Sequence, residues 1–356
     1  MNSFAGAQLR DLMVLLRDWH AFSGGRAGSE LPPRHVPFDQ LTGTHAFEEA
    51  IAREWRGGSV LVIRGEPGSG KSSALEFVLG EGEAEFLPLR LRLGQRSDVA
   101  AVTDPAAFAR HLASVIAFMA DDVAGAARMN LERELRPRQG SHSDRVGASF
   151  NLGLVRLDIA REVQSVARAG SEIDDVERAR TLLDVLREDG RHIVLLLDDL
   201  DHWFAADLHG ETAATTRDAF MTRIMRFLPE LGVAAGIAAQ PRHTSGDSWT
   251  QARDFVHLVL DVPQLPDAPA VRALLERRLR VALQQSNHTI TASDAHGLAA
   301  QIFTAEAVEE LLGVARSSPN RVRKMLSAAD RALGLAVDDG VMEVSDAAVK
   351  SAWAAL

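Results

Sequence analysis

Residues 59–79 read SVLVIRGEPGSGKSSALEFVL and place a glycine-rich turn between an apolar run and an amphipathic segment. Residues 60–63 are continuous aliphatics rich in β-branched side chains, which predicts a short parallel strand covered on both faces. Residues 65–72, GEPGSGKS, match the pattern G-x-x-x-x-G-K-[ST] of a phosphate-binding loop. Residues 71–79 predict a helix with one apolar face. Strand, loop and helix therefore follow in the order that such a loop requires.

Each residue type in this loop has a chemical reason. Glycines lack a Cβ atom, so the chain can adopt positive φ and bring its N–H groups close to phosphate oxygens. Lys71 adds a mobile positive charge, and Ser72 offers its hydroxyl to Mg²⁺. The N-terminus of the helix carries roughly half a positive charge toward the anion. The predicted phosphate-binding residues are Gly65, Glu66, Pro67, Gly68, Ser69, Gly70, Lys71, Ser72 and Ser73.

Length and composition bound the classes of function. The 356 residues suffice for two or three domains with sizeable cores. The net charge of −10 argues against a surface made broadly for nucleic acid, although DNA stays possible through local basic patches. The absence of cysteine excludes disulfides, thiolate metal sites and cysteine nucleophiles. No apolar run approaches the length of a membrane span and the N-terminus lacks a basic leader region, so we expect no membrane association and a cytoplasmic location.

A second signal for nucleotide chemistry lies at residues 192–201, HIVLLLDDLD, where five consecutive aliphatics end in paired acids. This is the Walker B pattern. A buried strand would deliver Asp198 to its C-terminal end, where the carboxylate can hold Mg²⁺ through water, while Asp199 can orient and deprotonate an attacking water. Two acids at such a position are costly unless a cation or solvent compensates their charge. Asp201 is expected to cap the following segment.

The N-terminal segment reads as an amphipathic helix followed by a linker. Residues 4–22 place Leu9, Leu12, Met13, Leu16 and Trp19 on one helical face. This face must pack on something, which is either the helix's own domain or a protein partner that docks through residues 1–22. The glycines and prolines that follow predict a linker up to residue 37.

Residues 133–149 break all periodicity and concentrate arginines, which predicts a long exposed loop. The loop is either a solvated insertion or a surface that touches nucleic acid or an acidic partner. Residues 86–94 alternate leucine with polar residues and predict an edge strand. Residues 105–120 and 172–188 predict helices, and residues 150–159 a further strand.

The sequence lacks the motifs that identify several other classes of phosphate-loop protein. The chain contains no N-K-x-D or T-K-x-D tetrapeptide, so guanine specificity lacks its usual reader. The L-S-G-G-Q signature of transporter-type ATPases is absent too. The long helical C-terminal region argues against a small-molecule kinase.

With these elements in order, the chain resembles the AAA+ superfamily, including its origin-recognition-type members, and the neighbouring STAND and KAP-type NTPases. The resemblance covers roughly residues 36–350. Residues 38–51, FDQLTGTHAFEEAI, are similar to the family segment F-x-x-L-x-G-R-x-x-E-x-x-x-L that lines the adenine pocket, although Thr44 stands where arginine is common. The resemblance implies that Val36, Pro37 and Phe38 pack on the base.

The resemblance also implies roles for residues outside the two Walker motifs. Gln240 ends the apolar run at 233–241, where the family has its polar sensor-1 residue. Arg253 matches the arginine that reaches into a neighbouring subunit's site, although the extra Asp254 departs from the pattern. Weaker candidates for this arginine are Arg217, Arg223 and Arg226.

The segment from Pro319 to Arg321 resembles the sensor-2 motif at the start of a lid helix, with the proline and asparagine in changed order. The resemblance therefore implies that Arg321 contacts the γ-phosphate, with Arg323 as the substitute.

The sequence thus predicts an α/β fold, a three-layer phosphate-loop core with a parallel sheet followed by an all-α lid domain. Residues 1–36 form the N-terminal helix and linker, 37–262 the ATPase core, and 263–356 the lid. The first hypothesis is a nucleotide-dependent switch that binds and hydrolyses ATP with Mg²⁺, assembles into homo-oligomers and regulates a partner complex in a DNA transaction or in defence and signalling. One alternative is a nucleotide-binding module with little turnover, and another is a DNA-binding ATPase.

Overall fold

The chain folds into two compact units. The computed structural model describes residues 6–23, 31–43, 46–91, 100–119, 122–123, 125–135, 172–204, 213–286, 291–317 and 321–356. The first unit comprises Met1–Ala52, Arg64–Glu81 and Leu260–Leu356, and the second comprises Arg53–Ile63 and Gly82–Val259. This division passes through the segment that the sequence assigns to one ATPase core, so the three predicted domains stay a prediction.

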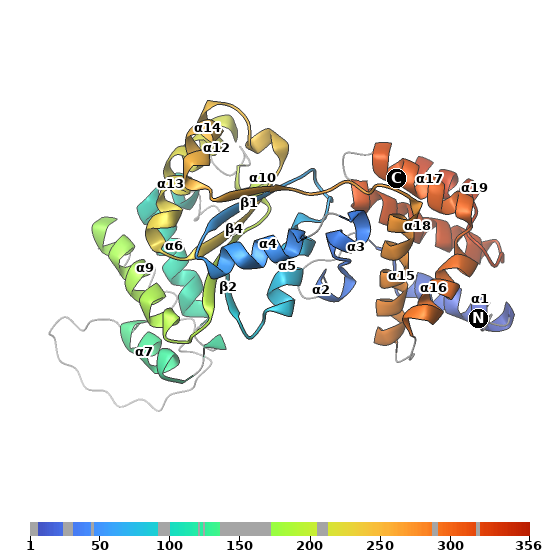
Figure 1. The fold of residues 1–356 in the computed structure, drawn as a ribbon, viewed down its shortest axis with the longest axis horizontal. Helices are drawn as coiled ribbons and strands as arrows, with labels where there is room; N and C mark the ends of the chain where they lie inside the picture. The colour runs from blue at the N-terminus through green and yellow to red at the C-terminus, as the bar shows by residue number, and fades with distance from the viewer. Residues whose placement is uncertain are drawn as a thin grey trace, which may run out of the picture. The chain divides into compact units, whose positions relative to one another are not determined.

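A five-stranded parallel sheet confirms the predicted α/β class, and its strand order is β2-β3-β4-β1-β5. The strands are β1 (Val60–Arg64), β2 (Phe86–Leu91), β3 (His192–Leu197), β4 (Ala234–Ala239) and β5 (Leu258–Asp261) (Figure 1). β2 lies at one edge, as its alternating sequence predicts. β4 separates β3 from β1, so the strands that end at the two Walker motifs are near neighbours rather than adjacent.

The sheet is buried on both faces, which explains why its central strands are apolar without alternation. Successive side chains of a strand point to opposite faces. Val60 and Val62 join one core cluster together with Leu195 and Leu197, while the intervening residues face the other way and are buried too. On that other side, the Trp55 ring meets the Phe86 ring edge-on at a centroid distance of 5.6 Å.

Helices of the second unit cover the first of these faces. They include α6 (Pro105–Phe118), α7 (Gly125–Leu135) and α9 (Glu172–Arg187), which confirm the helices expected at 105–120 and 172–188. Asp104 caps α6 by accepting a 2.7 Å hydrogen bond from the Ala107 amide. α7 extends to Leu135, so the loop predicted from residue 133 begins later than expected. The remainder of that loop and the strand expected at 150–159 lie outside the described residues.

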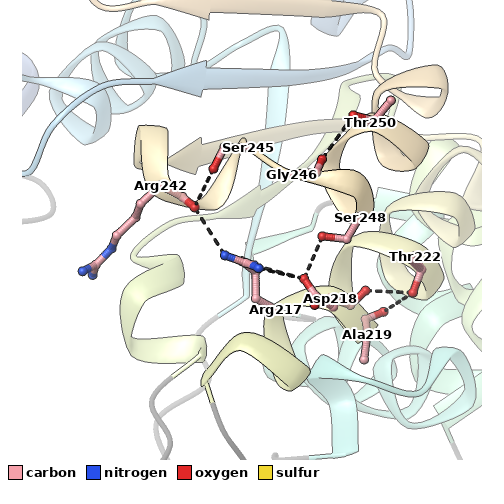
Figure 2. A network of polar contacts seen from close by, with 9 residues as sticks. All are labelled: Arg217, Asp218, Ala219, Thr222, Arg242, Ser245, Gly246, Ser248 and Thr250. Atoms are coloured by element: carbon pink, nitrogen blue, oxygen red, sulfur yellow. Dashed lines mark hydrogen bonds and ion pairs between the residues drawn. The ribbon is translucent and has the colours of Figure 1, made fainter.

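A polar network in the second unit joins α12, a helix between β3 and β4 in the chain, to the segment that follows β4 (Figure 2). α12 (Ala213–Ala219) runs into the π-helix η4 (Phe220–Ile224), while η6 (Pro241–His243) and α14 (Asp247–Ala252) follow β4. Asp218 accepts from Ser248 Oγ at 2.7 Å and from Arg217 Nη2 at 2.9 Å. These two donors hold the pKa of Asp218 below its usual range. The network fixes the chain that leaves the end of β4.

Helices dominate the first unit. Its N-terminal part has α1 (Gly6–Asp18), α2 (Leu31–Arg34), α3 (Phe38–Thr42), the start of α4 (Phe47–Arg56) and α5 (Lys71–Glu81). The C-terminal part has α15 (Ala268–Gln285), α16 (Ala292–Ile302), α17 (Ala305–Ser317), α18 (Arg321–Asp338) and α19 (Asp346–Ala354). This all-helical end of the chain agrees with the predicted lid.

The apolar face of α1 packs on its own chain. Met13 and Leu16 are fully buried, and α1 contacts α18 and α15. Arg17 Nη1 lies 3.1 Å from Asp338 Oδ1, and the Phe22 amide donates to Asp330 Oδ1 at 3.1 Å. Of the two possibilities that the sequence left open, the structure shows the intramolecular one. A protein partner that docks through this face of residues 1–22 would find it covered, so such docking stays a prediction for the other faces of the segment.

We predict that Leu16→Ala lowers the free energy of unfolding by about 2–4 kcal/mol, because a fully buried leucine would leave a cavity between α1 and the C-terminal helices. Denaturant unfolding measures this change. Gln8→Ala is the control, since Gln8 on the same helix is exposed and should cost much less. Equal and negligible effects of both substitutions would show that α1 is not packed in solution.

Candidate functional site

The loop after β1 has the conformation that close approach to an anion requires. Gly68 and Gly70 adopt φ of 69° and 108°, a region that disfavours residues with a Cβ atom. A Cβ atom on Gly65 would lie 2.6 Å from Ser69 Oγ and 3.2 Å from the side chain of Val262. α5 begins directly afterwards at Lys71, and its first turn closes through a 2.9 Å bond from the Ala74 amide to the Gly70 carbonyl. The main-chain N–H groups of this turn therefore face the space at the start of the helix.

Two side chains of the loop supply donors suited to a phosphate. Lys71 Nζ donates to the carbonyls of Gly65 at 2.8 Å and of Glu66 at 3.0 Å, which holds the ammonium group over the loop. The Ser69 hydroxyl is buried and finds no hydrogen-bond partner among the described residues. A buried unpaired hydroxyl is costly and calls for an acceptor from outside the chain. The residues present thus fit a bound phosphate group.

The residues predicted to meet the base lie against this loop. Pro37 precedes α3, which begins at Phe38, and Val36 and Phe38 are buried. The Phe38 ring comes within 3.4 Å of the position that a Cβ atom on Gly70 would take, so the ring lies directly over the loop. Within the first unit, the structure brings the predicted base segment and the predicted phosphate loop together.

A buried histidine connects these two parts, and sequence reasoning missed it. His35 Nδ1 lies 3.0 Å from Ser73 Oγ, and its Nε2 lies 2.9 Å from Glu48 Oε1. The same carboxylate oxygen accepts the Phe38 amide at 3.0 Å. Because the carboxylate only accepts, Nε2 donates to Glu48, while Nδ1 lies within hydrogen-bond distance of the Ser73 hydroxyl.

The His35 bridge spans three elements of the site. It joins the segment before α3 to α4 through Glu48 and to α5 through Ser73. Its ring also packs on Phe77, with a centroid distance of 4.7 Å. No short motif marks such a contact, and the only signal in the sequence is a lone histidine beside the base segment.

The start of α18 also contacts the loop. The Arg323 amide donates to the Gly68 carbonyl at 3.2 Å. In the amide orientation that satisfies both partners, Gln264 accepts from Arg321 Nη1 at 3.0 Å and from Nη2 at 3.2 Å. The predicted sensor-2 residues are therefore placed near the phosphate loop, with Gln264 as an unforeseen partner.

Three of the remaining predicted residues follow strand ends in the second unit. Asp198 comes directly after β3 and is half-buried, and Gln240 comes directly after β4. Asp199 is exposed and adopts φ of 58°, a left-handed conformation that aspartate, like asparagine, adopts more readily than most residues. Its amide donates to Asp198 Oδ1 at 2.9 Å.

The arginines proposed to act in a neighbouring subunit differ in how they are held. Arg253 is exposed and makes a 2.6 Å bond to the Val256 carbonyl. Arg217 belongs to the network of Figure 2, and Arg226 lies 6.0 Å from the Phe255 ring centroid. Arg223 Nη1 reaches the Thr103 carbonyl at 3.4 Å.

Asp201 does not cap the next segment, contrary to the sequence prediction. Asp199 is the residue that precedes α10 (Leu200–Trp203), and Asp201 lies inside this helix. Asp201 instead contacts Arg242 at 2.5 Å and His243. Burial opposes ionisation of Asp201, yet these two partners hold its pKa below the usual range. Burial lowers the pKa of His243, against the influence of Asp201. The group ties α10 to η6 and does not belong to the phosphate loop.

Comparisons with known proteins concern the fold alone. No family model matches the chain, and no curated protein matches it. The Aeropyrum pernix ORC1 protein in complex with DNA is similar at 17% identity and a TM-score of 0.48, over 95% of this chain and 68% of that chain. Cdc6p from Pyrobaculum aerophilum is similar at 13% identity and a TM-score of 0.45, over 93% and 69% of the two chains. The Thermotoga maritima RuvB Holliday junction branch migration motor is similar at 9% identity and a TM-score of 0.40, over 91% and 73%.

At these TM-scores, all below 0.5, the likenesses carry no inference about function. A separate observation concerns membranes. Within the described ranges, no helix combines the length and the hydropathy that a bilayer crossing needs.

We predict that His35→Phe weakens ADP binding by roughly tenfold, because the ring can still pack on Phe77 while both hydrogen bonds of the bridge are lost. Calorimetric titration with ADP measures the affinity. His35→Gln is the matched variant, since its amide can donate to Glu48 and accept from Ser73 and should restore most of the affinity. Equal losses in both variants would mean that His35 only supports the fold.

Proposed function

We propose that this protein is an AAA+-type ATPase that binds ATP with Mg²⁺ and uses hydrolysis as a conformational switch. The loop at residues 65–72 carries the proposal, because it joins three features of a phosphate site. These are main-chain conformations that only glycine adopts readily, a buried hydroxyl without a partner at Ser69, and the Lys71 ammonium held over the loop.

Sheet topology supports a metal site beside this loop. β1 and β3 are parallel, and only β4 lies between them, so their C-terminal ends reach the same edge of the sheet. Ligands of open α/β sheets bind at this edge. We propose that Ser72 and Asp198 hold Mg²⁺, with Asp198 acting through water. An ion held by these residues would supply positive charge that offsets the charge developing during phosphoryl transfer.

We propose that Asp199 and Gln240, which follow β3 and β4, activate the attacking water. Asp199 is exposed and held away from the strand by its left-handed backbone, which leaves its carboxylate free to accept a proton from water. Gln240 follows the strand between the two Walker motifs, where an amide can orient the same water. Both roles are proposals that the strand order supports.

We propose that the start of α18 changes position in response to the bound nucleotide. Arg323 already contacts the loop through its main chain, and Arg321 is held by Gln264 rather than by an acid. A guanidinium held by a neutral amide is available to a phosphate group, which offers a stronger charge-assisted bond. Release of the γ-phosphate would therefore return Arg321 to Gln264, and the position of α18 would report the bound nucleotide. ATP can shift this equilibrium only by its differential affinity for the two states.

Assembly would complete the site with an arginine from a neighbouring copy. Arg253 is the first candidate of the four, since it is exposed and matches the motif position, while Arg217 takes part in a network within its own unit. Such an arginine stabilises charge on the transferred phosphoryl group, so hydrolysis would depend on homo-oligomer formation. A partner complex that reads the assembly would act in a DNA transaction or in defence and signalling.

A nucleotide-holding module with little turnover is the second candidate. Asp199 is one methylene shorter than the glutamate that more often activates water, which favours slow hydrolysis. The two candidates share the binding site and differ only in turnover.

We predict that Lys71→Ala weakens ATP and ADP binding by roughly a hundredfold or beyond detection, since it removes the positively charged side chain of the loop. Asp199→Asn should keep nucleotide affinity, because asparagine tolerates the left-handed backbone, and should lose hydrolysis and retain the ATP-bound assembly. Calorimetric titration, phosphate release and light scattering with ATP, ADP or no nucleotide measure these changes.

Lys350→Ala is the matched control, since this lysine is exposed and pairs with Asp346 in α19. It should behave as the wild type. Normal hydrolysis by Asp199→Asn would show that Asp199 is not the general base. Nucleotide affinity unchanged in Lys71→Ala would contradict the proposed site, while tight binding without turnover in the wild type would favour the module.

A further inference from the structure

Asp201 joins the two strand ends of the second unit that carry the residues assigned to water activation. β3 and β4 are parallel neighbours, and Leu197 pairs with Ile237 in their register, so their C-terminal ends reach the same edge of the sheet. Asp199 follows β3, and Gln240 follows β4. The relative position of these two side chains therefore depends on what holds the chain beyond each strand end.

The chain beyond β3 is fixed by burial in the core. Trp203 and Phe204, at the end of α10, are buried. Both rings meet the Phe220 ring of η4 edge-on, at centroid distances of 6.0 Å and 5.4 Å. α10 is one short turn that begins directly after Asp199. Asp201 therefore lies on a turn that the core holds in place next to Asp199.

Beyond β4, the direction of Gln240 is set by the main chain of η6. The side chain of Gln240 makes no capping hydrogen bond to this helix. Its main-chain carbonyl accepts from the His243 amide at 2.9 Å, which closes the turn of η6. Pro241, the first residue of η6, restricts the backbone of the same turn. A shift of η6 would therefore move the Gln240 amide with it.

Asp201 holds η6 through one carboxylate oxygen. Asp201 Oδ1 accepts from Arg242 Nη2 at 2.5 Å and also contacts His243 Nε2. The buried His243 ring meets the Phe204 ring edge-on at a centroid distance of 5.0 Å. The main-chain carbonyl of Arg242 belongs to the network of Figure 2, while its guanidinium extends away from that network. Both side chains of η6 that contact Asp201 are thus held against α10.

We propose that Asp201 is a positioning residue for ATP hydrolysis, which ties η6 to α10 and so holds the Gln240 amide in place relative to Asp199. The inference rests on the proposed ATPase function and adds to it a residue outside the phosphate loop. Misplacement of a catalytic group by about 1 Å can cost roughly a hundredfold in rate. Asp201 would therefore govern turnover while leaving nucleotide affinity unchanged.

ATP hydrolysis by the full chain at matched protein concentration tests this role, with kcat counted per ADP-binding site found by calorimetric titration. We expect Asp201→Ala to lower kcat roughly tenfold to a hundredfold and to change ADP affinity and the KM for ATP less than about twofold. Asp201→Asn should recover most of the turnover, because its Oδ1 can accept from both Arg242 and His243. Glu85→Ala is the matched control, since Glu85 also pairs with an arginine, Arg56, but precedes β2 at the opposite edge of the sheet. It should turn over as the wild type.

A double-mutant cycle separates positioning from a general loss of stability. Gln240→Ala should itself lower kcat, and the further change Asp201→Ala should then cost less than about twofold, because the amide that Asp201 positions is already gone. Losses that multiply, unchanged turnover in either single variant, or equal losses in Asp201→Ala and Asp201→Asn would overturn the positioning role and leave the ATPase function standing. A wild-type chain that binds ADP without hydrolysing ATP would instead contradict the proposed hydrolysis, and this inference would fall with it.

Discussion

The electrostatics at the start of α5 govern the rest of this structure. Main-chain N–H groups, the helix dipole and the Lys71 ammonium concentrate positive charge around one short loop. Gly65, Gly68 and Gly70 allow this concentration, because side chains at these positions would clash or would resist positive φ. A chain that gathers so many donors needs an acceptor. The buried hydroxyl of Ser69 also lacks a hydrogen-bond acceptor among the described residues.

Two sets of contacts connect the phosphate loop and its helix to neighbouring segments. His35 and Glu48 tie the base segment to α5, while Arg323 ties the start of α18 to the Gly68 carbonyl. The first connection is buried and made of side chains, so it is rigid. The second consists of one main-chain bond at the beginning of a helix, which ligands can compete with. A bound nucleotide would therefore find its base held by a fixed segment and its terminal phosphate near a movable one.

Much of the fold could be predicted because local patterns carried it. The apolar strand at 60–63, the loop and α5 lie within one stretch of sequence. Five consecutive aliphatic residues before Asp198 predict β3. Contacts between distant segments could not be predicted in this way. The His35 bridge joins residues 13 and 38 positions apart in the chain, and the pairing of Asp201 with residues after β4 depends on the strand order. The covered face of α1 likewise depends on α18, more than three hundred residues later.

The most direct test of the central claim is a crystal structure of the full chain with Mg²⁺ and a non-hydrolysable ATP analogue. We predict that the β- and γ-phosphates lie against the main-chain amides of residues 66–72, with the metal ion between Ser72 and the water shell of Asp198. A triphosphate bound elsewhere, or a metal ion without any link to Asp198, would contradict the account.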